Sequence, residues 1–346
     1  MANEIAELNT IEIADIEKVN TLTDDNIADI NTLEFTGFSP PAWGNTRAVI
    51  AGGTASVDSD LGRIQYKTVG AAATALNFDD LQTTRSMHQC AGSNGTRGIF
   101  GGGGGRSGGA PVRGVSDSDY VTIASTGSAA DYADIDTPAT YGGRCGASNG
   151  TLLFSAGGYD GVSSPTATLD FMEYFTISTT NAGQKAGDLS AAKTGANSTN
   201  GDTRFIVNGG YVSGVGSTDV MEYNNFSTSA DVQPFGDLSS GTNTNSSVCT
   251  TIRAAMHCPV IGKERIEYVT VASTGDYTDW GDLDVSRDSS TGTSDGVTGE
   301  FFGGADADSG ASITSTEKIT IMTGTTGTEV GDLIEANRHA GATSGI

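Results

Sequence analysis

Short apolar runs alternate with segments rich in Gly, Ser, Thr, Asn and Asp along most of the chain. Runs such as RAVIAGG (47–53), RFIVNGG (204–210) and IEYVTV (266–271) carry β-branched or aromatic residues and end at glycine or at small polar residues. They are too short for helices, and their residue types favour strands. The pattern therefore predicts an all-β chain of short strands joined by turns.

One segment recurs at a fixed spacing. In IEYVTVASTGDYTDWGDL (266–283), Asp282 lies 14 residues after Tyr268, and five other pairs share this spacing. They are Tyr66 and Asp80, Tyr120 and Asp134, Tyr174 and Asp188, Tyr223 and Asp237, and Lys318 and Asp332. Their first members are separated by 54, 54, 49, 45 and 50 residues, so the chain contains six similar units.

Each unit contains four predicted strands: a small-residue segment such as CAGSNG (90–95), the apolar run with its Gly pair, the Tyr segment and the segment before the Asp. Unit five, RAAMHCPVIGK (253–263), lacks the Gly pair. Six four-stranded units predict a six-bladed β-propeller over residues 46–346. Unit one lacks a first strand, and RHAGATSGI (338–346) resembles one, so this C-terminal strand should close the ring and cover two sheet edges.

Unit three, RCGASNGTLLFSAGGYDG (144–161) followed by FMEYFTIST (171–179), resembles the kelch motif of Arg, apolar strand, Gly pair and downstream Tyr. The kelch Trp after the Tyr is missing, although Trp280 and its counterparts Phe78, Tyr132 and Phe235 lie two residues before the Asp. The repeat is also similar to kelch-like propellers of marine bacteriophages, whose blades carry IEYVTIASTG and GDL. This resemblance implies a kelch-like propeller in a virion protein.

Residues 1–45 have a different composition, with almost no glycine and an NTI or NTL segment at Asn9, Asn20 and Asn31. Apolar residues recur three or four positions apart, which predicts short helices near 11–19 and 24–31. The apolar positions are Ile5, Leu8, Ile13, Ile16, Val19, Leu22, Ile27, Ile30 and Leu33. We expect a helical arm that anchors the protein to a virion partner or to copies of itself; the alternative is folding back onto the propeller.

The chain is strongly acidic, with 42 Asp and Glu against 18 Lys and Arg and a formal charge of −24. Such a charge disfavours binding to nucleic acid or to anionic membranes. The N-terminus lacks a signal peptide and no stretch is apolar enough to span a membrane, so we expect synthesis in the host cytoplasm and location in the virion. The four cysteines are too few for a disulfide scaffold and are expected to be free thiols.

Residues that recur in every unit are predicted to be structural. The glycines suit turns, and the Asp of GDL can accept hydrogen bonds from the following turn. A basic residue follows this Asp by five positions at Arg85, Lys193 and Arg287, and by six at Arg338, where it can pair with a carboxylate.

Functional residues are expected where the units differ, in the loops between their second and third strands. Arg106 and Arg113 lie in the long loop of unit two, and Tyr159, Asp160 and Tyr211 follow the Gly pairs of units three and four. An aromatic residue beside a carboxylate favours sugar binding, while solvated loops or a protein contact are the alternatives.

No catalytic pattern is found, and we predict no enzyme, cofactor or metal site. The histidines are scattered at positions 88, 257 and 339, and GGGGGR (101–106) lacks the features of a phosphate loop. The sequence favours a non-enzymatic phage virion protein (decoration, fibre or tail) with possible adhesion to host-surface glycans. The alternative is a lectin or carbohydrate-active enzyme with a galactose-oxidase-like propeller; a bacterial surface adhesin is disfavoured because an export signal is missing.

Overall fold

Every regular element in the described part of the chain is a β-strand, as the sequence predicts. The computed structural model describes residues 45–56, 59–85, 90–107, 110–112, 116–134, 142–160, 167–243, 246–259, 264–324 and 326–345. Residues 43–346 form one structural unit. The predicted helical arm and its apolar positions, from Ile5 to Leu33, lie outside the described residues.

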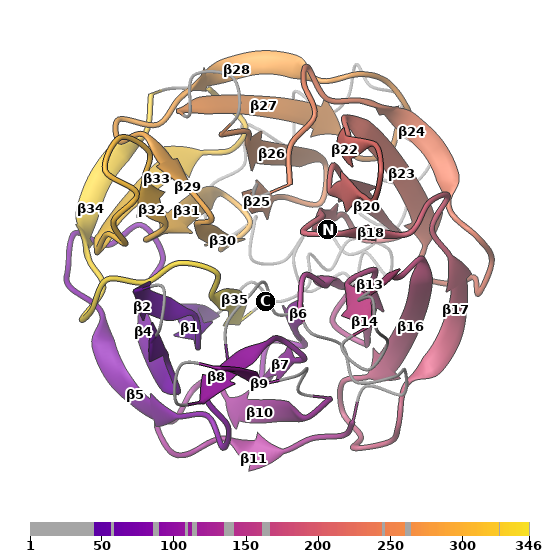
Figure 1. Cartoon of the computed structure of the whole chain (residues 1–346). Helices are drawn as coiled ribbons and strands as arrows, with labels where there is room; N and C mark the ends of the chain where they lie inside the picture. Colours follow the sequence, from indigo (N-terminus) through magenta and orange to yellow (C-terminus); the bar gives the residue numbers. More distant parts are fainter. Residues whose placement is uncertain are drawn as a thin grey trace, which may run out of the picture. The chain divides into compact units, whose positions relative to one another are not determined.

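The described strands form six four-stranded antiparallel sheets arranged around a central axis (Figure 1). Sheet one contains β35 (Gly341–Gly345), β1 (Asn45–Ala51), β4 (Arg63–Thr68) and β5 (Leu76–Asp80). Sheet two contains β6 (Cys90–Ser93), β7 (Arg97–Gly101), β10 (Ser118–Thr122) and β11 (Ala130–Asp131). Sheet three contains β12 (Cys145–Ser148), β13 (Leu152–Ala156), β16 (Phe171–Thr176) and β17 (Gln184–Asp188).

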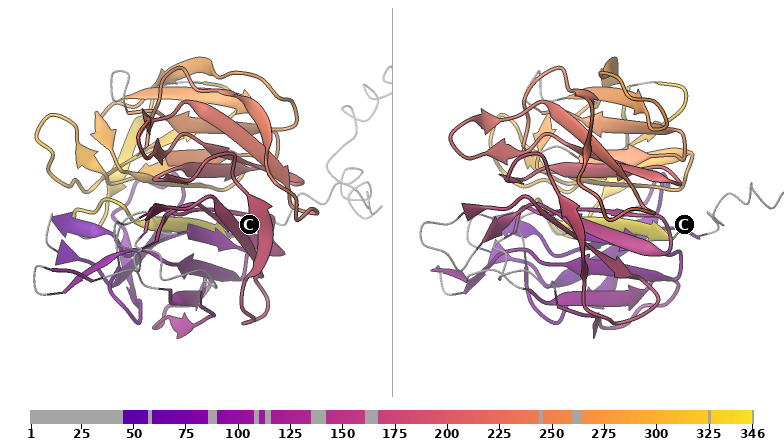
Figure 2. Two further views of the ribbon diagram at one scale, coloured as in Figure 1. Left: turned by 45° about the vertical axis from the view of Figure 1, so that its right-hand side comes forward. Right: turned by 90° about the vertical axis from the view of Figure 1, so that its right-hand side faces the viewer.

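The other three sheets follow the same order from the axis outward. Sheet four contains β19 (Asn197–Asn200), β20 (Arg204–Asn208), β23 (Val220–Asn225) and β24 (Gln233–Asp237). Sheet five contains β25 (Ser246–Cys249), β26 (Arg253–His257), β27 (Arg265–Thr270) and β28 (Thr278–Asp282). Sheet six contains β30 (Thr291–Ser294), β31 (Thr298–Phe302), β33 (Ser315–Thr320) and β34 (Thr328–Asp332). The arrangement is propeller-like, and the sheets lie side by side in both views of Figure 2.

The C-terminal strand completes sheet one. β35 pairs antiparallel with β1, with Thr343 opposite Val49 and Gly341 opposite Ala51. This pairing confirms the prediction that the end of the chain supplies the missing first strand.

The 14-residue spacing reflects the hairpin of the third and fourth strands, whose register shifts at the same place in five sheets. The recurring Tyr lies in the third strand, and five of the fourth strands end at the recurring Asp. In those five sheets the register shifts beside the residue before the Tyr (or, in sheet six, the Lys), for example between Met221 and Glu222. Gly187, with φ +90°, lies on the fourth strand, where an added Cβ would approach the Ala230 carbonyl oxygen to 2.3 Å. The glycine thus allows the loop of the next sheet to pack against this strand.

The core lies between the sheets. Each of six clusters of buried apolar residues joins two neighbouring sheets, so every boundary between sheets (a seam) contains an apolar cluster. At the seam of sheets three and four, the ring centroids of Phe154 and Phe205 are 4.8 Å apart, and Phe226 completes the cluster. Stacking such seams around an axis buries both faces of every sheet.

The recurring Tyr has a structural role, as predicted. Arg204 lies over the Tyr223 ring at 4.0 Å from its centroid and donates to the Val271 carbonyl oxygen in sheet five. Arg47, Arg97 and Arg253 make the same pair of contacts in sheets one, two and five. In sheet six, Thr298 replaces the arginine and Lys318 replaces the tyrosine, so both members of the cation–π pair are absent together. The cation–π contact thus holds each arginine within its own sheet, and its hydrogen bond connects that sheet to the next one.

A buried carboxyl or amide group, defined here as the joint residue, precedes each recurring Tyr or Lys. Four of them accept the N–H two residues after the Asp of the preceding sheet, as Glu222 does from Ser190 at 3.0 Å. The prediction that the Asp itself bonds to this turn is therefore corrected: the joint residue accepts this N–H, and the carbonyl of the Asp instead accepts from the next sheet, as Asp188 does from Val232.

The basic residues predicted to find carboxylates pair with the joint residues. Arg85 contacts Asp119 at 2.6 Å, Lys193 contacts Glu222 and Arg287 contacts Glu317, all with almost no exposure. Burial is the main cause that raises the pKa of Asp119 and lowers the pKa of Arg85, while their attraction opposes both shifts.

Arg338 is an exception to that prediction, because it donates to the Gly310 carbonyl oxygen instead. Asn337 lies five residues after Asp332 and donates to the Gly52 carbonyl oxygen. The joint residue of sheet one is Gln65, which is also neutral, so no cation is needed there.

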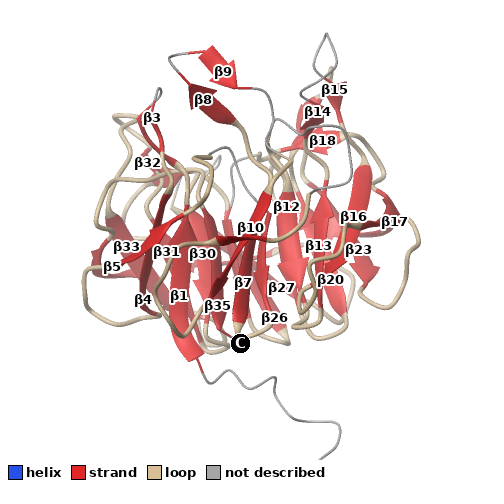
Figure 3. Ribbon diagram, turned by 90° about the horizontal axis from the view of Figure 1, so that it is seen from below, coloured by secondary structure: helices blue, strands red, loops and turns tan. Residues whose placement is uncertain are grey.

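Five small ribbons lie at the connections between second and third strands, and two of them include a strand (β18 or β29) from the connection that leads from one sheet to the next. They are β2 (Thr54–Ser56) with β3 (Ser59–Asp60), β8 (Gly105–Ser107) with β9 (Ala110–Val112), β14 (Tyr159–Asp160) with β15 (Ala167–Thr168), β21 (Tyr211–Val212) with β22 (Gly216–Ser217) and β18 (Lys193–Thr194), and β32 (Ala305–Asp306) with β29 (Arg287–Asp288). Figure 3 shows ribbon strands beyond one end of the sheets and the C-terminus at the other end. We call these ends the ribbon face and the opposite face.

Candidate functional site

The ribbon face brings together two of the predicted site residues. Tyr159 belongs to β14, and its N–H donates to the Gly142 carbonyl oxygen. Tyr211 belongs to β21, which pairs with β18, and the chain just after β18 bonds to Gly143. Burial raises the pKa of the Tyr159 phenol, and the nearby Tyr211 phenol raises it further. The two tyrosines therefore lie close together on adjacent ribbons.

The exposed part of this site is aromatic rather than acidic. Tyr211 is 38% exposed, whereas Asp160 is only 9% exposed. The aromatic–carboxylate pair expected for sugar binding is thus present in the chain at positions 159 and 160, but the carboxylate is largely covered. The exposed Tyr211 ring, beside the half-buried Tyr159, can stack on a flat apolar surface such as one face of a sugar.

Of the two arginines in the same prediction, only Arg106 lies among the described residues. Arg106 lies in β8, where its backbone pairs with Pro111 of β9. Arg113 lies outside the described residues. The long loop of unit two therefore forms a ribbon on the same face as the tyrosines, at a different sheet (Figure 3).

An exposed apolar residue of the ribbon of sheet four extends this site. Val215 is 79% exposed and lies in the turn between β21 and β22. The sequence signal for it was the VSGVG segment (212–216), an apolar residue between two glycines in a short loop. Sheet five has no ribbon among the described residues, so the ribbon face is uneven from one sheet to the next.

The opposite face carries a second surface, which the sequence analysis missed. Ile252, Val297 and Met322, the apolar sector, are 56%, 62% and 43% exposed. The Met322 carbonyl accepts from Arg253 at 2.8 Å, and the Val297 carbonyl accepts from the residue before Met322 at 3.0 Å. These contacts make the three side chains neighbours across sheets five and six.

The apolar sector is specific to these sheets. Ile252 and Val297 accept a backbone hydrogen bond from the residue after the third strand of their own sheets, and threonines hold the same position in the other four sheets. These threonines are Thr46, Thr96, Thr151 and Thr203. Because threonine suffices for the fold in four sheets, the apolar residues in the other two have no evident folding role. An exposed apolar group of this kind favours contact with a partner.

The inner strands surround a narrow polar channel on the axis. Its two cavities, of about 100 and 90 Å³, share one small residue from each sheet. These residues are Ala91, Gly146, Ser198, Ser247, Gly292 and Ala342. Serine hydroxyls connect the inner strands at every seam, as Ser93 does to the Ser344 carbonyl oxygen at 2.5 Å and Ser344 to that of Ser294 at 2.6 Å. The channel lining thus serves to hold the inner strands together.

In the described residues, no three His, Cys, Asp or Glu side chains are positioned to hold a metal ion. All four cysteines are free, and burial raises the pKa of Cys145 to about 11, which keeps its thiol protonated and unreactive at neutral pH. No helix in the part of the chain described is long and apolar enough to cross a membrane.

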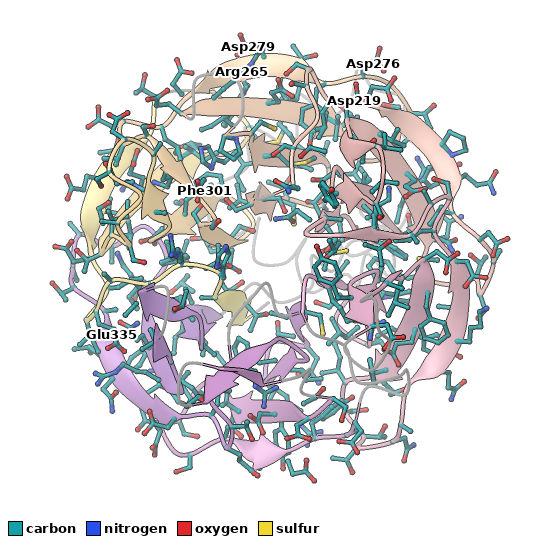
Figure 4. All side chains as sticks on the ribbon, in the orientation of Figure 1. Asp219, Arg265, Asp276, Asp279, Phe301 and Glu335 are labelled. Carbon is teal, nitrogen blue, oxygen red and sulfur yellow. The ribbon has the colours of Figure 1, made fainter. Side chains whose placement is uncertain are left out.

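Acidic side chains occupy the outer rim. Asp276 and Asp279 lie there, and Arg265 reaches Asp279 at 3.5 Å, whereas Phe301 is closer to the axis (Figure 4). Asp276 also accepts the N–H of Asp237 from the neighbouring sheet at 3.0 Å. Charged groups on the outermost strands oppose edge-to-edge pairing with other chains.

Comparison with known proteins supports the fold alone. No protein-family model matches the sequence, and no curated protein matches it. A solved structure titled "Structure of YjhT" aligns with a TM-score of 0.62 and 12% identity, over 81% of this chain and 97% of that one. In all, 417 chains of known structure match, so the architecture is widespread and does not by itself indicate a function.

Proposed function

We propose that this chain is a six-bladed, kelch-like β-propeller and a non-enzymatic structural protein of a bacteriophage particle. Each four-stranded sheet is one blade, and the Gly pairs and recurring Tyr support the kelch-like assignment. The phage setting is supported by the similarity of the IEYVTVASTG and GDL segments to those of marine phage propellers.

The difference between the two faces is the observation that carries the proposed role. One face presents exposed Tyr211 and Val215 on an uneven set of ribbons. The other presents the apolar sector, in which Ile252 and Val297 stand where the other four sheets have threonine. A protein held on a particle needs two such unlike surfaces: the ribbon face is directed outward, and the opposite face contacts a virion partner.

Incorporation into particles tests this role. Ile252→Thr, Val297→Thr and Met322→Thr together should reduce the amount of protein on purified particles, as should deletion of residues 1–45. Tyr211→Ser with Val215→Ser should leave incorporation unchanged and reduce attachment to host cells. Absence of the wild-type protein from purified particles contradicts the proposal, and so does normal incorporation of both the triple variant and the truncated chain.

The tyrosine pair favours a second candidate function, a carbohydrate-binding lectin that acts without a particle. Under this alternative, the intact chain binds a glycan array, and Tyr211→Ala abolishes the signal. Val297→Thr on the opposite face is the matched control and should retain it. Glycan binding by a protein that is absent from particles favours the lectin over the virion role.

A further inference from the structure

The seam between sheets six and one differs from the others at one equivalent position. In each sheet, one second-strand residue lies opposite the recurring Tyr or Lys, and its counterpart on the next sheet is the residue after that sheet's Tyr or Lys. Going round the ring, these equivalent positions are Val49 and Val121, Ile99 and Phe175, Phe154 and Asn224, Ile206 and Val269, Ala255 and Ile319, and Glu300 and Lys67. Both members of four of these pairs belong to the apolar cluster at their seam, whereas Glu300 and Lys67 form an ion pair.

Both charges of this pair are deeply buried. Lys67 is 3% exposed and Glu300 is 0% exposed, and Lys67 Nζ lies 2.6 Å from Glu300 Oε1. Lys67 also donates to Thr316 Oγ1 at 3.0 Å and to the Val330 carbonyl oxygen at 3.2 Å. Gly70 donates its N–H to Glu300 Oε2 at 2.7 Å. Three further groups from the two sheets (Thr316, Val330 and Gly70) therefore bind the two charges of this ion pair, which joins distant parts of the chain.

Burial of a charge without a counter-ion is strongly unfavourable, whereas a fully satisfied pair is tolerated. At any other seam, Lys67 would meet Val49, Ile99, Phe154, Ile206 or Ala255 instead of a carboxylate. Glu300 would likewise meet an apolar group or the Asn224 amide on any sheet other than sheet one. The six sheets are alike enough to exchange places, so the ends of the ring need a feature that distinguishes them.

We infer that the Lys67–Glu300 pair selects sheet six as the neighbour of sheet one, so that the ring closes with all six sheets. Closure by sheet four or five, with the last sheet left out, buries Lys67 without a partner. The pair costs some stability compared with an apolar seam and gives specificity in return, as buried polar groups do when they fix the register of coiled coils.

Charge exchange between two copies tests this selection. Lys67→Glu and Glu300→Lys each place like charges at the seam, and each variant alone should have a lowered melting temperature. When the two full-length variants are unfolded and refolded together, sheet one of each accepts sheet six of the other, which restores both ion pairs. The mixture should then contain heterodimers whose melting temperature is close to that of the wild type.

An exposed ion pair at the same seam is the matched control. Arg63 Nε lies 2.8 Å from Glu335 Oε1, with side chains 37% and 30% exposed. Arg63→Glu and Glu335→Arg should lower the melting temperature little, and their mixture should form no exchanged dimer, because exposed pairs contribute little.

A neutral pair keeps the test decisive if the single variants do not fold. Lys67→Val with Glu300→Ile copies the apolar pair at the seam of sheets four and five, and this double variant should fold. After unfolding and refolding, it should give a larger fraction of misassembled species than the reversed ion pair, Lys67→Glu with Glu300→Lys. Equal monomer yields from the neutral, reversed and wild-type chains overturn the inference. So does a mixture of folded single variants that shows no restored melting transition.

Discussion

At the scale of single residues, a charged joint residue is paired with a residue of opposite charge, and a neutral joint residue lies at a seam with a neutral residue in the place of that cation. Glu222 receives Lys193 and the Ser190 N–H, whereas the seam of sheets six and one uses two neutral groups, Gln65 and Asn337. In the neutral version Gln65 accepts the Ile334 N–H and Asn337 donates to the Gly52 carbonyl oxygen, so neither version leaves a buried charge without a counter-ion. A mixed version, with one charged and one neutral member, leaves a charge in the core without its counter-ion.

The first prediction follows from this matching. Glu222→Gln should destabilise the fold by about 3–5 kcal/mol, because it leaves the Lys193 ammonium buried without a carboxylate. Lys193→Asn with Glu222→Gln copies the neutral seam and should recover most of the loss, as measured by urea unfolding. Equal stability of the single and double variants would show that the charge match is unimportant.

The second prediction concerns alkaline pH. Tyr132 is 3% exposed and donates to the Thr176 carbonyl oxygen at 2.8 Å, and burial raises its pKa to about 12. In the unfolded chain the phenol deprotonates near pH ~10. Between these values the folded state holds more protons than the unfolded state, so stability falls as pH rises.

Tyr132→Phe removes this pH dependence along with a hydrogen bond worth about 1 kcal/mol. The variant should be less stable than the wild type at neutral pH, and the gap in melting temperature should narrow as the pH rises above ~10. A gap that stays constant over this range contradicts the assignment of the alkaline loss to Tyr132.

The structural role of the recurring residues could be predicted from the sequence, since a residue present in every unit meets a need common to every unit. The joint residues could not. Met221 and Glu222 face opposite sides of sheet four: Met221 packs at the seam with sheet five, and Glu222 meets Lys193 at the seam with sheet three. Because neighbouring sheets cover both sides, Glu222 is buried although a Glu in a strand is usually exposed.

At the scale of elements, the six hairpins and the closing strand could be read from the 14-residue spacing and from the incomplete first unit. The ribbons could not, because β14 and β21 have two residues each and no alternating pattern. Asp160 shows the consequence: pairing within its ribbon leaves it mostly covered, although loop carboxylates are usually exposed.

The third prediction concerns β35. Deleting residues 341–346 removes the backbone pairing with β1 and exposes the buried inner edge of sheet one. At about 1 kcal/mol per hydrogen bond, the lost pairing alone removes several kcal/mol. The thermal transition should move sharply downward, and a synthetic peptide of residues 338–346 should restore part of it, while a scrambled peptide should not. A truncated chain as stable as the intact one would contradict this role.

At the scale of the whole molecule, the chain has a formal charge of −24, with 42 Asp and Glu and only 18 Lys and Arg. Several of these cations are already buried in ion pairs. The remaining carboxylates on the rim repel one another. The fourth prediction is that added salt raises the melting temperature, because a Debye length of about 10 Å at 0.1 M screens the rim but not the core. A melting temperature that is flat or falls between low and moderate sodium chloride would contradict it.

The two faces illustrate the limit of sequence reasoning about function. The ribbon tyrosines were found because their loops differ between units. The apolar sector was missed because Ile252, Val297 and Met322 lie in three separate turns, each unremarkable by itself, and only the ring makes them adjacent.

The placement of β35 also sets an order of events during synthesis. Sheets two to six are each built from one continuous stretch, so each can complete its hydrogen bonding as soon as that stretch leaves the ribosome. Sheet one is made first but must wait for residues 341–345, with the inner edge of β1 uncovered throughout elongation. Nascent chains of this protein should therefore depend on chaperones most at their oldest segment, which is the reverse of the usual vectorial pattern.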